Sequence, residues 1–562
     1  MKTGPNALFV YPRFNAGSFW NYVETCKLTG ARAPSPPLGL ITVAAMLPDH
    51  WNLRLRDRNV EDLSDADLDW ADVVLLGAML PQQRDALHMI GLCKAAGVPI
   101  VVGGPDPTSA PDIYAAADFR VLGEVEEIIA DFAAAFESGD RRGDFLAEKF
   151  KADVTRTPVP RFDLLNFRNY LEVNVQFSRG CPFLCEFCDI IELYGRNPRA
   201  KTTPQMLAEL QAIFDLGHRG MVQFVDDNLI GNKKAVKAFL PDLVAWQKAH
   251  GYPFEFSTEA SLNLADDDDF LGMLRDANFV AVFVGIESPD PDVLITARKK
   301  QNTRRDIAAN VHKIQSFGIF VAAGFIVGFD DEKPGMAEAL VDLIEECAIP
   351  VAMTGLLFAL PNTQLSRRLA REGRLFQDFA LSQTWSEGDQ CTDGLNFATR
   401  RPRAEVLRDY RTVIERTFDR EAFFARVAES VRRIDATGAN GQMHRARAVR
   451  EVVDFLRLAW SVTTRHRDLR GPFWRLLLAT ARRNPGALKH AIYQAALFAH
   501  LGPFSRRVID VVDQRIAEID AGTWRVADFL APAADTVAVP EAVPPVPAGA
   551  ARPAPVTAAS RA

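Results

Sequence analysis

The chain has 562 residues, of which 48% are hydrophobic and 24% charged, a composition typical of soluble globular proteins. Its formal net charge of -7 argues against a protein built as a whole to bind nucleic acid. At roughly 150 residues per domain, this length predicts about three or four domains.

No segment is expected to cross a membrane. The longest late uncharged stretch, residues 490–505, is shorter than the roughly 20 apolar residues that span a bilayer. The apolar run at 7–12 is followed by Arg13 and is expected to be a first strand rather than an export signal. Seven cysteines, three of them crowded into 181–188, do not suit a disulfide framework. They indicate a reducing compartment, so a cytoplasmic protein is expected.

Residues 1–150 alternate short apolar runs with helix-length stretches, a pattern that predicts a parallel, doubly wound α/β sheet. The expected strands are at 7–12, 53–59, 72–79, 99–105 and 119–124. Ligands of such sheets bind at the carboxyl ends of strands, which here carry Asp57, Gly77 to Leu80, and Gly103 with Gly104. Each glycine taken alone is also explained by a tight strand-to-helix turn.

A linker at 151–169 leads to residues 170–375, where six further strands alternate with helices. The strands are expected at 173–178, 221–227, 254–260, 281–287, 321–329 and 352–360. Six such units predict a partial (β/α)6 barrel of the TIM type, whose site lies at the carboxyl ends of its strands.

Residues 376–530 are predicted to form a helical domain in which Lys and Arg exceed Asp and Glu. Residues 531–562 are rich in Ala, Pro and Val and have little to bury, so a disordered tail is expected.

The strongest motif is formed by Cys181, Cys185 and Cys188 in a C-x-x-x-C-x-x-C run. Thiolates suit iron-sulfur clusters and zinc alike, but a structural zinc site normally has four protein ligands. The nearest further Cys or His residues are Cys93 and His218, both more than 25 residues away. Three fixed ligands would leave one iron of a four-iron cluster open to another molecule.

With Phe187 just before its last cysteine, this motif resembles the signature of the radical S-adenosylmethionine (SAM) superfamily. The resemblance implies a [4Fe-4S] cluster whose fourth iron is chelated by the amino and carboxylate groups of SAM. It also implies an external electron donor, such as a ferredoxin or flavodoxin, and reductive cleavage of SAM to a 5'-deoxyadenosyl radical.

Five further residues resemble the SAM-binding motifs of that superfamily. Asp226 and Asp227 in FVDDN stand where its members bind the methionine amino group, with the register between the two left open. The usual Gly-Gly-Glu is not present. Glu259 stands where the ribose hydroxyls are bound, and Gly324 and Gly328 lie on the strand expected beside the adenine. Alone, the two glycines would indicate only a glycine-bearing barrel strand.

The first domain resembles the cobalamin-binding domain that precedes one radical SAM subclass. The matching positions are Asp57, the turn that ends at Leu80, and the pair Gly103 and Gly104. Asn59 stands where related domains carry the histidine that ligates cobalt. The resemblance therefore implies a bound cobalamin whose cobalt is five-coordinate or holds water.

From about residue 5 to 420, the chain most resembles the hopanoid C-2 methylase and its relatives, which share a C-terminal helical domain of unknown function. The stretches CEFCDI, LYGRNPR, FVDDN followed by IGN, and VGIESPD carry this resemblance. This implies a methyltransferase that removes hydrogen from an unactivated carbon and delivers a methyl radical from methylcobalamin, which a second SAM then remethylates. The substrate would be a small or lipid-like molecule. Two alternatives stay open, namely a cobalamin-binding radical SAM enzyme that catalyses cyclisation, oxidation or rearrangement, and a non-enzymatic redox sensor.

Residues 471–507 mix Trp474 and leucines with Arg and Lys, which could lie on an anionic membrane at its inner face. The alternative is a helical pair whose apolar stripe faces the protein core and whose arginines are solvated. Nucleic-acid binding is not expected, since nothing in the segment resembles a base-reading module.

Overall fold

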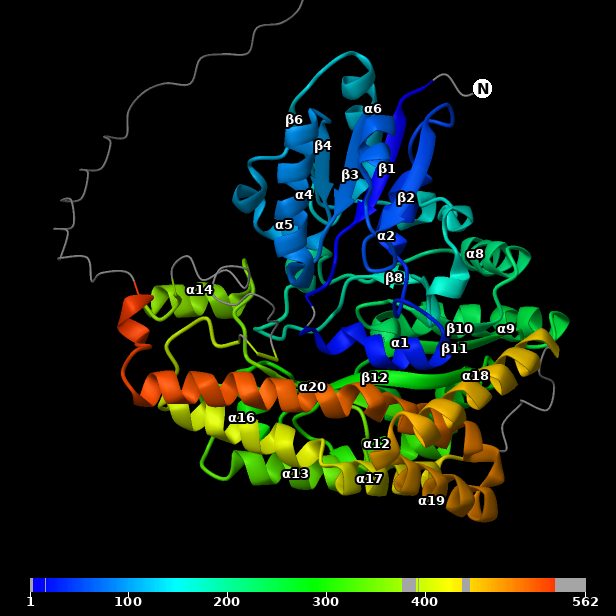
Figure 1. The fold of residues 1–562 in the computed structure, drawn as a ribbon, viewed down its shortest axis with the longest axis vertical. Helices are drawn as coiled ribbons and strands as arrows, with labels where there is room; N and C mark the ends of the chain where they lie inside the picture. The colour runs from blue at the N-terminus through cyan, green and yellow to red at the C-terminus, as the bar shows by residue number, and fades with distance from the viewer. Residues whose placement is uncertain (1–3, 16, 377–390, 393, 437–444, 531–562) are drawn as a thin grey trace, which may run out of the picture.

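The computed structural model describes residues 4–15, 17–376, 391–392, 394–436 and 445–530. Two six-stranded sheets and a C-terminal group of helices make up this part of the chain (Figure 1). The tail expected to be disordered, 531–562, lies outside the described residues.

The first sheet is parallel throughout and has the order β2-β1-β3-β4-β5-β6. Its strands are β1 (Asn6–Tyr11), β2 (Asn52–Asp57), β3 (Val73–Gly77), β4 (Ile100–Gly103), β5 (Phe119–Leu122) and β6 (Gly143–Leu146). Because β1 and β3 are apolar on both faces, each face is covered by helices. One face packs on α2 (Leu38–Ala44) and α6 (Ile129–Glu137), and the other on α3 (Asp65–Trp70) and α4 (Gln83–Ala96). The doubly wound sheet is confirmed.

The second sheet is a curled half-barrel with the parallel order β14-β13-β12-β11-β10-β7. Its strands are β7 (Glu172–Val175), β10 (Gly220–Phe224), β11 (Phe254–Ala260), β12 (Phe279–Glu287), β13 (Phe320–Val327) and β14 (Ala352–Leu356). Its helices are α8 (Thr203–Asp215), α9 (Lys233–Ala249), α10 (Asp268–Asp276), α11 (Pro291–Thr296), α12 (Ile307–Ser316) and α13 (Met336–Glu346). The partial barrel expected from six strand-helix units is confirmed.

The side chains of β11 alternate between the hydrophobic core and the concave face of the half-barrel. Phe254 and Phe256 are buried in the hydrophobic core that includes the covering helices. The alternate residues Glu255, Ser257 and Glu259 point to the opposite, concave face, because side chains alternate along a strand. Strand β11 therefore presents polar side chains to the concave face, and Glu259 stands nearest the carboxyl end of the strand.

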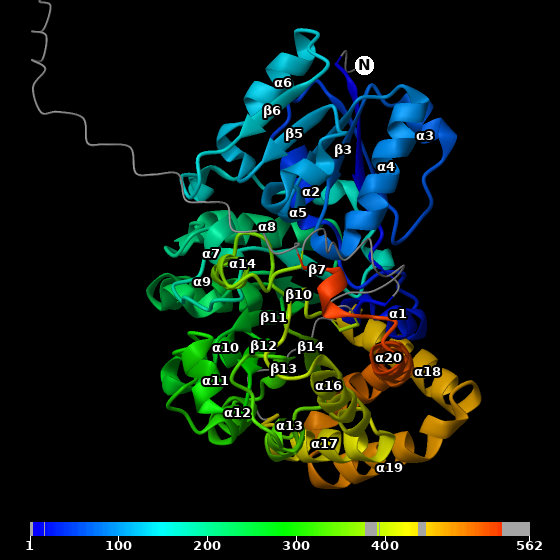
Figure 2. The same cartoon turned by 90° about the vertical axis from the view of Figure 1, so that its left-hand side faces the viewer.

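The C-terminal helices lie beside the half-barrel, at the lower right of Figure 2. They are α16 (Arg403–Thr417), α17 (Arg420–Arg433), α18 (Arg445–Thr464), α19 (Arg467–Arg483) and α20 (Leu488–Asp520). Helix α14 (Gln364–Arg371) instead lies at the left of Figure 2. Lys489 of α20 and Arg447 of α18 both pair with Glu255 on the concave face of β11. Burial opposes the charge of Glu255, but Lys489 and Arg447 outweigh it and lower the pKa of this carboxyl.

The stretch 471–507 packs mainly inward. Phe473 of α19 and Phe498, Leu501 and Phe504 of α20 are buried in the main hydrophobic core. This burial favours the interpretation of the stretch as helices that face the protein core. No helix among the residues described has the length and apolar character that crossing a membrane requires.

A short N-terminal segment leaves the first sheet and packs on the helical domain. Helix α1 (Val23–Thr29) lies beside α20 in both views (Figures 1 and 2). The rings of Phe19 and Phe504 are 5.6 Å apart, and those of Tyr22 and His500 are 5.5 Å apart. The pattern of strands in residues 1–150 gave no sign of this excursion, because the contact is made almost 500 residues further along the chain.

His218 is expected to make the half-barrel sensitive to acid. Burial lowers the pKa of this imidazole from 6.5 to about 3, so the folded chain binds fewer protons than the unfolded chain between these values. The stability that the neutral His218 contributes to the folded chain is therefore lost progressively as the pH falls below about 6.5. At pH 5 the free energy of unfolding is lower by about 2 kcal/mol. In His218→Phe, the melting temperature should fall less between pH 7 and pH 5 than it does in the wild type. The exposed His88→Phe is the matched control, and an unchanged pH dependence in His218→Phe would contradict the assignment.

Candidate active site

The three cysteines of the motif lie in one loop at the carboxyl end of β7. A two-stranded antiparallel ribbon, β8 (Ser178–Arg179) with β9 (Arg199–Ala200), closes this loop, which also contains the short helix α7 (Ile190–Leu193). The amide of Cys181 donates to the carbonyl of Gly195 at 3.2 Å. Gly180 has φ +101°, and a Cβ there would lie 2.9 Å from the same carbonyl oxygen. The base of the loop is therefore closed too tightly for a side chain at position 180.

The chemistry of these thiols fits an iron-sulfur cluster. Cys181, Cys185 and Cys188 are all free, and burial raises the pKa of the Cys181 and Cys188 thiols. Amide donors point at two of the sulfurs, from Asn228 Nδ2 to Cys181 Sγ at 3.8 Å and from Gln301 Nε2 to Cys185 Sγ at 3.6 Å. Such donors stabilise the negative charge that a cluster places on its sulfurs.

Within the described residues, no three His, Cys, Asp or Glu side chains are placed to hold a single metal ion. A four-iron cluster binds each thiolate to a different iron atom, so its cysteines need not converge on one point. The donor set is therefore compatible with a cluster held by three cysteines.

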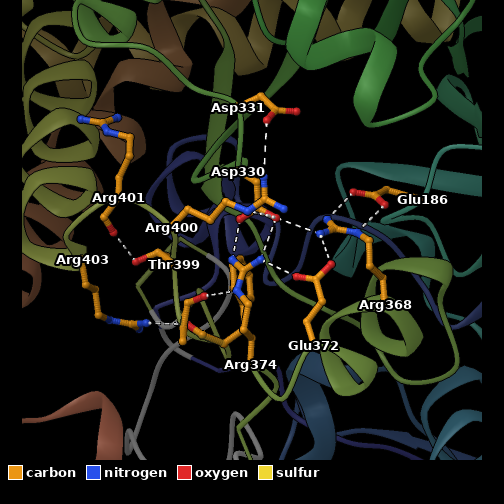
Figure 3. A network of polar contacts seen from close by, with 12 residues as sticks. Glu186, Asp330, Asp331, Arg368, Glu372, Arg374, Thr399, Arg400, Arg401 and Arg403 are labelled. Carbon is orange, nitrogen blue, oxygen red and sulfur yellow. Dashed lines mark hydrogen bonds and ion pairs between the residues drawn. The ribbon is translucent and has the colours of Figure 1, made fainter.

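An arginine network fixes the middle of the cysteine loop (Figure 3). Arg368 of α14 reaches Glu186, which follows Cys185, at 2.9 Å, and Asp330, which follows β13, at 2.8 Å. Arg374 also binds Asp330. Burial opposes the charge of Asp330, but Arg374 and Arg368 lower the pKa of this carboxyl. The network thus ties the cysteine loop to the end of β13.

A buried ion pair beside the cysteines was not predicted. Lys299 Nζ lies 2.7 Å from Glu287 Oε1, and a Cβ on Gly285 would lie 2.7 Å from the same Nζ. Burial opposes the charge of Lys299, but Glu287 and then the thiol of Cys185 raise the pKa of this ammonium. Sequence reasoning noted Glu287 only as the end of a strand, and no spacing signal marked Lys299 as its partner.

The two aspartates of FVDDN have different surroundings. Asp226 is buried and accepts hydrogen bonds from the Phe177 amide at 2.9 Å and from the Ser178 amide and hydroxyl. Asp227 accepts from the Gly180 amide at 2.8 Å through Oδ2. Both oxygens of Asp226 are thus used by the chain itself, whereas Asp227 keeps Oδ1 for another partner. This difference makes Asp227 the more available carboxylate, and which of the two aspartates binds SAM stays a prediction.

Asp227 and Glu259 form a pair of carboxylates above the concave face. Burial raises the pKa of Glu259 to about 7, and repulsion from Asp227 and then from Asp226 adds to this rise. Burial also raises the pKa of Asp227 to about 7. Around Glu259, the described residues offer its carboxylate no hydrogen bond. Two carboxylates whose charge is poorly compensated suit a ligand that carries a cation and hydroxyl groups.

Gly324 of β13 and Gly328, just after this strand, are explained mainly by packing. A Cβ on Gly324 would lie 3.0 Å from the Phe283 ring. Gly328 has φ +110° and lies against the side chain of Leu395, while its amide donates to Glu332 Oε1 at 2.7 Å. Their expected place beside an adenine stays a prediction.

The carboxyl edge of the first sheet carries the residues expected to hold cobalamin. Asp57 is buried and accepts from the Asn59 amide at 2.9 Å and from the Tyr170 hydroxyl at 3.0 Å. The Asn59 side chain donates to the Pro12 carbonyl and accepts from the Phe14 amide, at 3.0 and 2.9 Å. Asn59 thus braces two loops, and its amide is already used at the position where related domains carry the ligating histidine.

Gly103 and Gly104 form a cradle of bare backbone, packed so closely that a side chain at either position would strike neighbouring backbone. A Cβ on Gly103 would lie 2.9 Å from the Val121 carbonyl oxygen. Gly104 has φ +96°, and a Cβ there would lie 2.9 Å from the Ala78 carbonyl oxygen. Leu80 follows Ala78 in the half-exposed turn after β3. Bare backbone at the ends of β3 and β4 is what close approach of a large planar cofactor requires, so these residues fit the expected group.

Ion pairs hold this edge against the cysteine loop. Arg179 of β8 lies 2.7 Å from Glu126, and Arg199 of β9 lies 2.8 Å from Glu124, both of which follow β5. Arg199 also donates to the Tyr194 carbonyl at 2.9 Å and so closes the loop. In Figure 2 the first sheet stands above the half-barrel. The ion pairs therefore hold the loop after β5 against the base of the cysteine loop.

Comparisons with known protein families agree with this arrangement. The model of the B12 binding domain matches residues 28–133, and that of the radical SAM superfamily matches 175–344. A domain of unknown function matches 363–514.

Curated relatives and solved structures extend the likeness over most of the chain. The chain is 41% identical to an uncharacterized methyltransferase of Synechocystis sp., over 91% of this chain and 93% of the relative. It is 34% identical to the hopanoid C-2 methylase of Rhodopseudomonas palustris, over 90% of this chain and 94% of that enzyme. The solved cobalamin-dependent SAM radical enzyme OxsB has a TM-score of 0.56 at 14% identity, covering 93% of this chain and 82% of OxsB, which shows a shared fold.

Proposed function

The chain belongs to the cobalamin-dependent radical SAM methyltransferases, and from that premise we propose that it methylates an unactivated carbon of a hopanoid-like lipid. The relative from Rhodopseudomonas palustris, which carries the hopanoid name, matches this chain through the C-terminal helices as well as the two cofactor domains. That extent of likeness supports a related substrate class.

One observation carries the methyl-transfer part of the proposal. The ion pairs of Arg179 with Glu126 and of Arg199 with Glu124 hold the loop after β5, the strand beside Gly103, against the cysteine loop. A substrate carbon held between the two edges would lie within reach of both sites. An enzyme that used cobalamin only as a distant structural element would not need this clamp.

When bound, the cluster and SAM would supply a 5'-deoxyadenosyl radical, and cobalamin would supply the methyl group. Cys181, Cys185 and Cys188 would hold the cluster, with Asn228 and Gln301 donating to its sulfur ligands. Asp227 and Glu259 would bind the SAM amino group and ribose. Gly103 and Gly104 would let cobalamin approach the backbone, while Asn59 keeps the loop beneath it in place. The electron would come from an external donor of the ferredoxin or flavodoxin type.

The deciding experiment is anaerobic reconstitution with iron, sulfide, hydroxocobalamin and SAM, followed by incubation with a hopanoid and mass spectrometry. We expect 5'-deoxyadenosine together with a product heavier by one methylene unit. 5'-Deoxyadenosine with an altered product that lacks the added methylene would favour cyclisation, oxidation or rearrangement. If a knockout strain still contains every methylated lipid of its parent, the hopanoid substrate is rejected. The reaction class is then left in place.

Substitutions at the two aspartates should have different effects, one on SAM binding and the other on the stability of the fold. Asp227→Asn is expected to weaken SAM binding by about tenfold or more, because it removes the charge that pairs with an ammonium, while the fold persists. Asp226→Ala should instead destabilise the chain by about 3 kcal/mol or more, because it strands buried donors on Phe177 and Ser178. Equilibrium dialysis with SAM and thermal melting measure the two effects. Equal SAM affinity in wild type and Asp227→Asn would contradict the proposed register.

A further inference from the structure

Helix α18 shows an apolar stripe to solvent. Val449, Val452, Leu456 and Trp460 are 64%, 58%, 59% and 68% exposed. They are spaced three or four residues apart, so they line one face of the helix. Val453 lies on the same face and is also exposed. A stripe this long differs from the single exposed apolar side chains that are normal on protein surfaces.

The opposite face of α18 is pinned to the protein. Arg447 is buried, forms ion pairs with Glu255 and Glu451, and donates to the Tyr252 carbonyl at 3.3 Å. Leu458 and Val462 are buried in the main core. The helix therefore cannot turn to hide its stripe without breaking a buried ion-pair cluster at the half-barrel. Figure 2 shows α18 at the outer edge of the molecule.

Positive charge surrounds the stripe. Arginines outnumber acidic residues from 445 to 483. Arg445 lies one turn before Val449, and the exposed Arg457 lies beside Leu456. Exposed arginines continue through the turn into α19, at positions 465, 467, 470 and 475. The acidic neighbours are Glu451 and Asp454, which pair with arginines of α18, and the exposed Asp468.

We propose that this face of α18 docks on an anionic lipid bilayer. An apolar stripe with flanking arginines is the pattern of a helix that lies in the interface of a membrane. A second copy of the chain would bring the same arginines face to face, whereas an anionic bilayer neutralises them. Docking itself does not depend on the substrate, although its use in reaching a membrane lipid rests on the proposed function.

The test is co-sedimentation of the full-length holoenzyme with vesicles of phosphatidylcholine, with and without phosphatidylglycerol. The wild type should bind only the anionic vesicles, and the double variant Leu456→Gln, Trp460→Gln should lower this binding by about tenfold or more, because two apolar side chains are lost. Leu146→Gln is the matched control, since Leu146 is 72% exposed but lies on β6 of the first sheet.

Two outcomes would overturn the proposal. One is equal vesicle binding by the wild type and the double variant, including no binding by either. The other is a change from dimer to monomer in the double variant, seen by light scattering, because it would assign the stripe to a second copy. Vesicle binding is read without turnover, so a failure to methylate hopanoids leaves this test unaffected.

Discussion

Replacing Cys185 by Ser should lower the formation of 5'-deoxyadenosine from SAM by more than about a hundredfold, since losing a ligand exceeds the usual effect of losing its supporting hydrogen bonds. Cys185 is the most buried thiol of the motif, receives the Gln301 amide at 3.6 Å, and stands next to Glu186 in the arginine network. A serine hydroxyl is a much poorer ligand for iron than a thiolate. Iron content, the visible spectrum of the cluster and product chromatography measure the effect.

Cobalamin binding should survive in Cys185→Ser, because the glycine cradle belongs to the other sheet. Cys93→Ala is the matched control, since Cys93 is equally buried but lies on α4 behind the first sheet. It should keep its iron and its SAM cleavage. Full SAM cleavage by Cys185→Ser would reject the cluster assignment, whereas loss of cobalamin as well would indicate general unfolding.

The sheets could be predicted because their strands are apolar on one or both faces and are separated by helix-length segments. Every barrel strand expected between 173 and 360 is present. The three cysteines were recognisable because a cluster needs its ligands close together in one loop. Strand β6 was missed because it is a partly exposed edge strand, GDFL, without a run of apolar residues.

Contacts between distant segments left no local trace in the sequence. The pairing of Lys299 with Glu287, the packing of Phe19 on Phe504, and the bracing of Pro12 by Asn59 depend on the complete fold. The expectation of a membrane-facing segment was limited in the same way, because exposure depends on tertiary packing. Hydropathy drew attention to 471–507, but tertiary packing buries much of that stretch and leaves the stripe of α18 exposed.

Replacing Gly104 by Val should remove cobalamin binding while SAM cleavage continues, which is the opposite of the result expected for Cys185→Ser. The backbone of Gly104 has φ +96° and ψ -177°, a region that L-residues avoid, and a Cβ there would lie 2.9 and 3.0 Å from Ala78 backbone atoms. Cobalamin should then dissociate, because its cradle is displaced. Methylated product should fall by about a hundredfold, the usual cost of misplacing a reacting group by about 1 Å. Formation of 5'-deoxyadenosine should continue.

The matched control for this change is Gly139→Val. Gly139 has φ +99°, but a Cβ there would meet no atom within 4 Å, so it carries the backbone strain without the steric clash. Cobalamin absorbance and methyl transfer should therefore stay near wild type in Gly139→Val while the melting temperature falls. If Gly104→Val binds cobalamin as tightly as the wild type, the glycine pair is a packing feature of the β3 and β4 ends, and the cofactor must lie elsewhere. Loss of methylation with SAM cleavage intact is the result that would link the cradle to the transferred methyl group.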